Sequence, residues 1–132
     1  MANYYTQFSC TLDVGTAENA QKALEIYKAP TDLLEDDENF CYGFALSILP
    51  NSPTVLHIHD DELGNTDYVF TYVGLLAKTL GLKGKWGFSY ANTCSKARVD
   101  AFGGGAYVMD LETGEEIAVV DTNTWLDTKL QP

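Results

Sequence analysis

The sequence of 132 residues contains no long apolar run. A membrane-spanning helix needs roughly 18 or more such residues in succession. The first residues also lack the basic and apolar segments of a secretory signal. We therefore expect a cytoplasmic protein that makes no contact with a membrane.

Cysteine is scarce as well, because Cys10, Cys41 and Cys94 are the three in the chain and they stand far apart. An odd number without close spacing does not form a disulfide framework, so we expect free thiols in a reducing compartment. The hydrophobic share of 45% and the length fit a single domain over residues 1–132.

Positive charge is the third shortage, since 8 basic residues stand against 19 acidic ones and leave a net charge of -11. Residues 1–67 hold 12 acids and 2 bases, whereas residues 68–132 hold 7 acids and 6 bases. This field repels nucleic acid and anionic membranes and favours cationic partners. We predict no direct binding of nucleic acid and a protein partner with a basic surface.

The apolar residues alternate in several segments, which is typical of strands with one buried face. This pattern predicts strands over residues 4–12, 40–49, 54–59 and 86–91, and a hairpin over 105–111 and 116–121. Residues 31–39 carry too many carboxylates for a strand and are predicted to form a loop.

Two segments have helical spacing and recognisable ends. The first runs over about 17–28 after Thr16, and the second begins at an Asn65 or Thr66 cap and stops at Gly81. The C-terminal TNTWLDTKL is expected to dock on the body through Trp125 and Leu126. The order of elements predicts an α+β fold, a ferredoxin-like βαββαβ antiparallel sheet with two helices on one face, extended by a C-terminal β-hairpin.

His57 and His59 stand two apart in a strand, so both project to one face, and Asp60, Asp61 and Glu62 follow. Imidazoles and carboxylates together can bind a transition metal. A third ligand at suitable spacing is missing, and the alternative is a polar outward face on a strand whose other residues point inward. We predict no metal and no cofactor.

Cys94 lies in a predicted loop, residues 92–102, beside cations that could lower its pKa. A cysteine hydrolase also needs a general base. His57 or His59 could serve only if the fold places one of them beside Cys94. The loop candidates for a small-ligand site or hydrolase are Asn92, Cys94, Lys96, Arg98 and Asp100. With Lys83 and Lys85, the two loop cations form the one basic area that we expect on this acidic protein.

The glycines at 103–105 do not match a phosphate-binding loop, because no Lys and no Ser or Thr follow them. A bulge or a close approach of another backbone explains them better.

The carboxylates at 32–38 and 60–62 allow three interpretations: a solvated surface, an acid–base pair, or a row of charges that imitates DNA phosphates. We favour the third. The partner-binding residues are then Glu35, Asp36, Asp37, Glu38, Asp60, Asp61 and Glu62.

Residues 84–111, GKWGFSYANTCSKARVDAFGGGAYVMDL, and the later TNTWL resemble a stretch of uncharacterised small proteins from phages, plasmids and other mobile elements. The resemblance is strongest at WGF, NTCS and FGGGA and carries no catalytic assignment. It implies a setting in which small acidic proteins often inhibit host defence. We therefore expect a non-enzymatic inhibitor that binds a nucleic-acid-processing or defence protein, with the oligomeric state left open.

Overall fold

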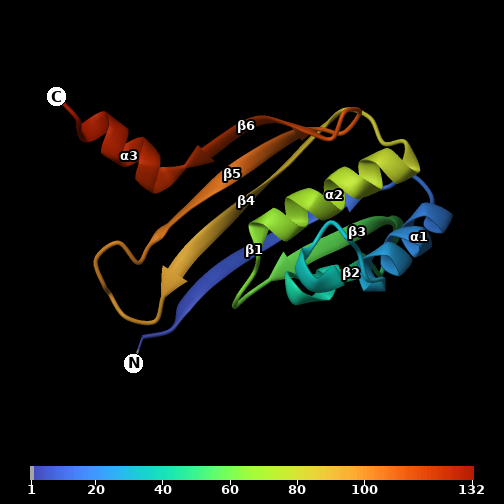
Figure 1. The fold of residues 1–132 in the computed structure, drawn as a ribbon, viewed down its shortest axis with the longest axis horizontal. Helices are drawn as coiled ribbons and strands as arrows, with labels where there is room; N and C mark the ends of the chain where they lie inside the picture. The colour runs from blue at the N-terminus through green and yellow to red at the C-terminus, as the bar shows by residue number, and fades with distance from the viewer. Residues whose placement is uncertain (1) are drawn as a thin grey trace.

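The computed structural model describes residues 2–132, which form a six-stranded antiparallel sheet with helices on one face (Figure 1). The strand order is β2-β3-β1-β4-β5-β6. The strands are β1 (Tyr4–Asp13), β2 (Ala45–Leu49), β3 (Ser52–Asp60), β4 (Lys85–Cys94), β5 (Gly103–Asp110) and β6 (Glu115–Asp121). The helices are α1 (Ala17–Lys28), α2 (Thr66–Leu80) and α3 (Thr122–Leu130), with two 3-10 turns, η1 (Glu35–Asp37) and η2 (Phe40–Tyr42).

The predicted ferredoxin-like βαββαβ fold with two helices is wrong, because one antiparallel sheet of six strands is accompanied by three helices. The C-terminal segment supplies the extra helix. Asp121 at the end of β6 accepts a hydrogen bond from the backbone N–H of Thr124 at 3.0 Å, which starts α3 at once. The expected docking is also wrong, because no residue of α3 is buried.

The predicted strand over 40–49 is wrong for residues 40–44, which turn before the strand begins. A Cβ at Gly43 would overlap the side chain of Tyr68, so the chain needs glycine where it passes α2. Phe40 to Tyr42 turn instead as η2, with the side chain of Asn39 accepting from the N–H of Cys41 at 3.0 Å. Strand β2 therefore begins only at Ala45.

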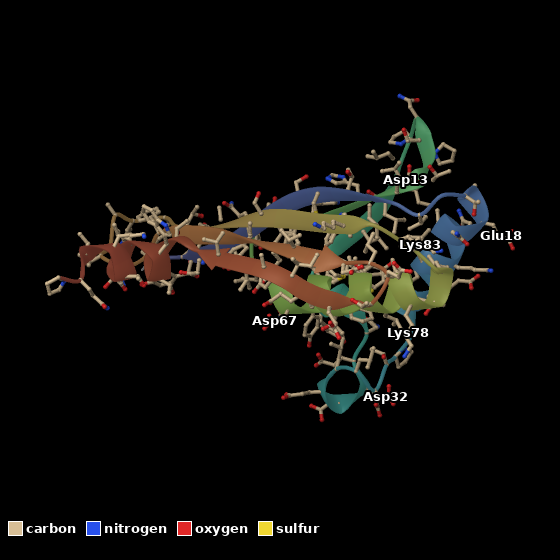
Figure 2. All side chains as sticks on the ribbon, turned by 90° about the horizontal axis from the view of Figure 1, so that it is seen from above. Asp13, Glu18, Asp32, Asp67, Lys78 and Lys83 are labelled. Carbon is tan, nitrogen blue, oxygen red and sulfur yellow. The ribbon has the colours of Figure 1, made fainter. Side chains whose placement is uncertain are left out.

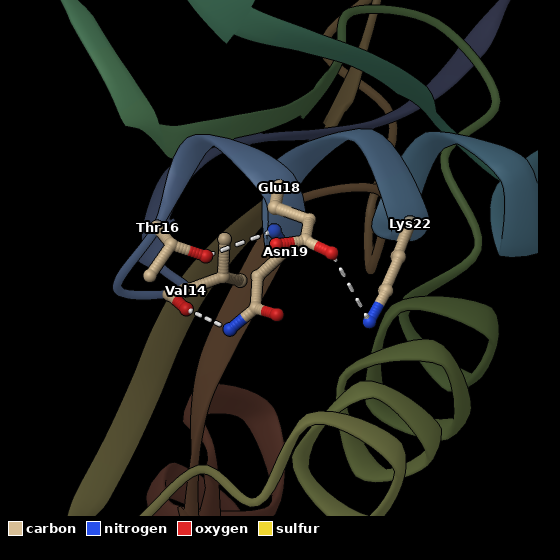
Figure 3. A network of polar contacts seen from close by, with 5 residues as sticks. All are labelled: Val14, Thr16, Glu18, Asn19 and Lys22. Carbon is tan, nitrogen blue, oxygen red and sulfur yellow. Dashed lines mark hydrogen bonds and ion pairs between the residues drawn. The ribbon is translucent and has the colours of Figure 1, made fainter.

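Helix α1 has the bounds that the sequence predicted, and its first turn is held by local hydrogen bonds (Figure 3). The hydroxyl of Thr16 accepts from the N–H of Asn19 at 3.0 Å, and the Asn19 side chain donates to the carbonyl of Val14 at 2.9 Å. Lys22 and Glu18 form an exposed ion pair at 3.9 Å. The cap ties the helix to the end of β1.

Helix α2 also follows the prediction, from its Asn65 cap to Gly81, which ends it with φ 67. Its buried residues share one side of the helix and are Val69, Tyr72, Val73, Leu76 and Ala77. Tyr72 is completely buried and its hydroxyl donates to the carbonyl of Ala23 in α1 at 2.7 Å. This bond and an aromatic cluster with Phe40, Phe44 and Tyr27 join the two helices.

The sheet has one covered and one uncovered face. Phe8, Leu56, Ile58, Phe88 and Met109 point toward α1 and α2 and are buried. The residues between them point the other way, and opposite residues in antiparallel strands share a face. We call this second side the open face; its members include Gln7, Ser9, Ala45, Ser47, His57, His59, Ser89 and Ala91.

The glycines that open β5 are explained by close packing of backbones, as predicted. A Cβ at Gly104 would collide with the carbonyl oxygen of Tyr90, and one at Gly105 with that of Val120. At these two positions β4 and β6 therefore approach β5 so closely that only glycine fits.

Two glycine-to-alanine changes should have opposite effects. Gly105→Ala should destabilise the fold because the new methyl group meets the Val120 carbonyl. Gly74→Ala in α2 should stabilise it by roughly 0.5–1 kcal/mol, because the nearest atoms would be 3.9 Å away and alanine favours a helix. Thermal and urea unfolding of the two variants measure both effects, and a stabilised Gly105→Ala would contradict the packing argument.

Candidate functional site

The two acidic segments lie on different sides of the molecule. Glu35, Asp36 and Glu38 line a hollow of about 420 Å³ beside α2, together with Asp67. Figure 2 shows the preceding loop, marked by Asp32, on the far side of α2 from the sheet. Asp60 and Asp61 line a separate hollow that reaches the open face. The structure therefore does not assemble the predicted carboxylates into one continuous row.

The segment 35–38 is a sharp turn that exposes the side chains of Glu35, Asp36 and Asp37 to solvent. Asp36 and Asp37 have φ 56 and 51, in the left-handed region that non-glycine residues seldom occupy. Glu38 is engaged inside the protein, because the hydroxyl of Tyr68 donates to its Oε2 at 2.9 Å. This hydrogen bond to the carboxylate raises the pKa of Tyr68.

The larger hollow crosses the middle of the sheet and has a volume of about 650 Å³. Four strands contribute to it: β1, β2, β3 and β4. Small residues form its floor, and the stacked histidines and two carboxylates lie at one side. We call it the sheet hollow; its open-face lining is Gln7, Ser9, Ala45, His57, His59, Ser89 and Ala91, with Asp60 and Asp61 at the end of β3.

His57 and His59 stack on each other, with ring centroids 4.2 Å apart and an interplanar angle of 26°. The Oγ of Ser9 and the Nε2 of His57 are hydrogen bonded at 2.8 Å, with the donor set by the tautomer. Loss of hydration, and then the neighbouring His59, lower the pKa of His57 below 6.5. His57 is therefore mainly uncharged at neutral pH.

Gln7 fixes the position of the acidic end of the hollow. Its Nε2 donates to the backbone carbonyl of Asp61 at 3.1 Å, and its Oε1 accepts from the hydroxyl of Thr93 at 3.2 Å. The chain after β3 is thereby attached to β1 and β4, with the Asp61 side chain exposed to solvent.

The Ser9–His57 pair has the spacing of a nucleophile and its base. Among residues 2–132, however, no carboxylate is hydrogen bonded to the His57 ring, so the third member of a triad is missing. The described residues also contain no group of three metal-ligating side chains. The sheet hollow combines the uncharged His57 ring with the exposed carboxylate of Asp61, a pair of groups that suits binding of a cation better than hydrolysis.

The predicted loop 92–102 is shorter in the structure, because Asn92 and Cys94 belong to β4. Cys94 pairs with Tyr4 and so faces the helix side of the sheet, whereas His57 and His59 face the open side. The structure does not bring a histidine to Cys94. Asn92 is occupied in a hydrogen bond, since its Oδ1 accepts from the hydroxyl of Thr6 at 3.0 Å.

Lys96, Arg98 and Asp100 remain in the loop 95–102, and Asp100 adopts φ 62. The loop is tied to the N-terminal segment, where Ser95 and Asn3 exchange two hydrogen bonds of 2.8 and 2.9 Å. Lys83 and Lys85 lie at the opposite end of β4, whose ten residues span about 30 Å. The prediction of a single basic area is therefore wrong.

Ser9, Gln7 and Ser89 were not among the predicted site residues. Their alternation with apolar neighbours shows that they point outward, but nothing in the local sequence indicates that β1 pairs with β3 and β4. The pairing of β1 with β3 brings Ser9 next to His57.

No family model, no curated protein and no solved structure matches this chain. The resemblance to mobile-element proteins therefore receives no support from these comparisons. Within residues 2–132, none of the helices has both the length and the apolar composition for a bilayer crossing.

His57 should titrate below pH 6.5 in the folded protein. Because its folded pKa is lowered, protonation costs stability as the pH falls through the unfolded value, and no cost arises above it. His59→Gln should move the His57 midpoint upward, since it removes the second cause of the shift. NMR titration of the imidazole protons measures both midpoints, and a His57 midpoint above 6.5 would contradict the stacked arrangement.

The three thiols should differ in their reaction with an alkylating reagent at neutral pH. Burial raises the pKa of Cys10 to about 12, so it should remain unmodified, while exposed Cys41 should react readily. Half-buried Cys94 should react no faster than a model thiol. Mass spectrometry of the digested protein measures each rate, and a hyper-reactive Cys94 would favour the hydrolase alternative.

Proposed function

We propose that this protein is an acidic binding module whose sheet hollow receives an arginine or lysine side chain from a basic protein partner. The observation that carries the proposal is the unneutralised charge. Within residues 2–132 the structure shows one ion pair, Lys22–Glu18, which lies on α1. Asp60 and Asp61 line the hollow with no cation from the described chain opposite them.

The hollow has the features that a cationic side chain requires. Its volume of about 650 Å³ lies within the range of roughly 300–1,000 Å³ common for ligand sites. Ala45, Ala91 and Ser89 give an uncrowded floor for an aliphatic stem. A guanidinium group stacks on flat aromatic faces and pairs with carboxylates, and the His57 ring and Asp61 supply one of each.

The segment 35–38 has a different part in this proposal. It lies on the far side of α2 from the sheet, so it does not contact a partner side chain bound in the sheet hollow. Its charges instead attract the basic partner over a longer distance. Nucleic-acid-processing proteins are the class of partner that this field fits, because their grooves are basic. The resemblance to mobile-element proteins supports the narrower proposal that the partner is a component of host defence.

Two variants with the same change of net charge test the site. Asp60→Lys with Asp61→Lys should abolish the shifts that an arginine-rich peptide induces in the NMR signals of His57 and His59. Asp36→Lys with Asp37→Lys should weaken peptide binding but leave those shifts in place. This variant reduces the negative potential that attracts the peptide, whereas the residues that contact the peptide in the sheet hollow are unchanged. Titration of labelled protein with the peptide, at low and high salt, measures both.

Binding should weaken as salt rises, since exposed charges are screened. It should also weaken below the His57 pKa, because a protonated imidazole repels the cation. If the two double variants lose affinity equally and His57 and His59 show no peptide-induced shifts in the unchanged protein, the protein has a diffuse acidic surface and no site in the hollow.

A further inference from the structure

We propose that the basic partner binds as an added strand of the sheet, paired with the outer edge of β2. Every second side chain of this strand is an arginine or lysine that crosses β2 and enters the sheet hollow from the open face. The inference rests on the proposed function, because it names the conformation and the sequence pattern of the segment that the sheet hollow receives.

Strand β2 is an edge of the sheet, and its outer side has no backbone partner within residues 2–132. Its five residues pair with β3 on one side only. None of the backbone–backbone hydrogen bonds of the turns and loops in the described chain reaches them. Such an edge presents free N–H and C=O groups to an extended chain, and β2 contains no charged residue or proline that would protect it.

The open face of β2 has small side chains, which leave a path from the edge to the histidines. Ala45 pairs with His59, and Ser47 pairs with His57. Neighbouring strands lie about 4.8 Å apart, so a long cationic side chain on an added strand passes over Ala45 or Ser47 and brings its head group to β3. The two imidazole rings and the exposed carboxylate of Asp61 are the groups that it meets there.

The covered face of β2 indicates the nature of the other side chains. Leu46 and Ile48 pair with Ile58 and Leu56, which are completely buried. Leu46 and Ile48 are themselves only partly buried, so the apolar layer between the sheet and the helices is incomplete at this edge. Apolar residues on the covered side of an added strand extend that layer.

The two faces together define a sequence pattern for the partner. Successive side chains of a strand point to opposite faces, so cationic and apolar residues alternate along the added strand. The alternation is the same whether the added strand runs parallel or antiparallel to β2. Because β2 has five residues, the matching segment of the partner is about as long, with its cations opposite Ala45 and Ser47.

Charge selects a basic segment at this edge in preference to a second copy of the chain. Residues 29–77, which contain β2, β3 and the acidic end of the sheet hollow, include 9 acids and no Lys or Arg. The bases that precede them, Lys22 and Lys28, belong to α1 on the covered face. A second copy paired through β2 would bring two such acidic segments together, which like charges disfavour.

The other edge of the sheet does not offer the same combination. Strand β6 carries carboxylates of its own at Glu115 and Glu116, which protect an edge, and β5 separates it from the sheet hollow. A strand added there would have β6, β5, β4 and β1 between it and the histidines of β3. Only a strand added at β2 can place a cation over them.

The first test compares two peptides of about six residues with blocked ends and equal numbers of arginine and valine. One peptide alternates the two residues, and the other has its arginines in a block. The alternating peptide should bind the whole chain about tenfold more tightly, because only its arginines all point to one face of a strand. NMR titration of isotope-labelled protein measures both affinities and the shifts of His57 and His59.

Methylation of backbone nitrogens in the alternating peptide tests the strand pairing itself. Alternate N–H groups of a strand point toward one neighbour, so a single set of them bonds to β2. One methylated peptide carries its methyl groups on the valine nitrogens and the other on the arginine nitrogens, which matches their charge and composition. One of the two should lose about tenfold or more in affinity, whereas the other should stay within about twofold of the unmethylated peptide.

Amide hydrogen exchange locates the bound peptide. The N–H groups of β2 that point away from β3 should exchange more slowly in the complex, because they gain an acceptor. The amides of β6, the opposite edge strand, are the internal control and should exchange at an unchanged rate.

Ala45→Leu should weaken binding of the alternating peptide by about tenfold, because the larger side chain covers the path from the edge to His59. The matched control is Ala118→Leu, which makes the same change at an exposed position of β6 and should leave the affinity unchanged. Thermal unfolding of both variants shows that they remain folded. An unaltered affinity of Ala45→Leu would exclude the path across β2.

Equal affinities of the two methylated peptides, without slower exchange in β2, overturn the added strand. If His57 and His59 still shift in that case, the sheet hollow receives a cation by another route and the proposed function stands. If neither histidine shifts with any peptide, the proposed function fails as well. Slower exchange of the outer β2 amides in the free protein as its concentration rises also overturns the inference, since a second copy would then occupy the edge.

Discussion

The structure depends on the packing of α1 and α2 against a single face of the sheet. Tyr72 is the centre of that packing, since its ring is completely buried and its hydroxyl bonds to the backbone of α1. Because both helices pack on one face of the sheet, neither of them covers the strand residues that point to the other face. The open face, with its stacked histidines, follows from that one-sided arrangement.

The same packing separates the molecule into regions of different chemistry. The acidic half of the sequence forms α1, the turn 35–38 and the strands up to Asp60, so negative charge surrounds the helical layer and one side of the sheet hollow. The nearly neutral half forms β4, β5, β6 and α3. Under the proposed function, a cationic partner is therefore drawn to the side of the molecule that the first half of the sequence forms.

Local patterns predicted most elements, because helix caps and alternation act over a few residues. The bounds of α1 and the cap of α2 are examples, since Thr16 and Asn65 bond to N–H groups two or three positions away. The errors arose where distant residues decide the outcome. Tyr68 in α2 leaves no room for a side chain at Gly43, beside the turn that replaces the start of the predicted strand, and Asn92 and Cys94 became strand residues because they pair with β1.

The sequence by itself determined the charge, its division between the two halves, and which residues of each strand point outward. It also determined the two groups of carboxylates, at 35–38 and 60–62. Only the tertiary structure decided that these two groups lie apart, that Ser9 bonds to His57, and that α3 projects without a buried residue. The physical reason is that backbone hydrogen bonds are alike for every pair of strands, so the choice of neighbour depends on how the whole chain packs.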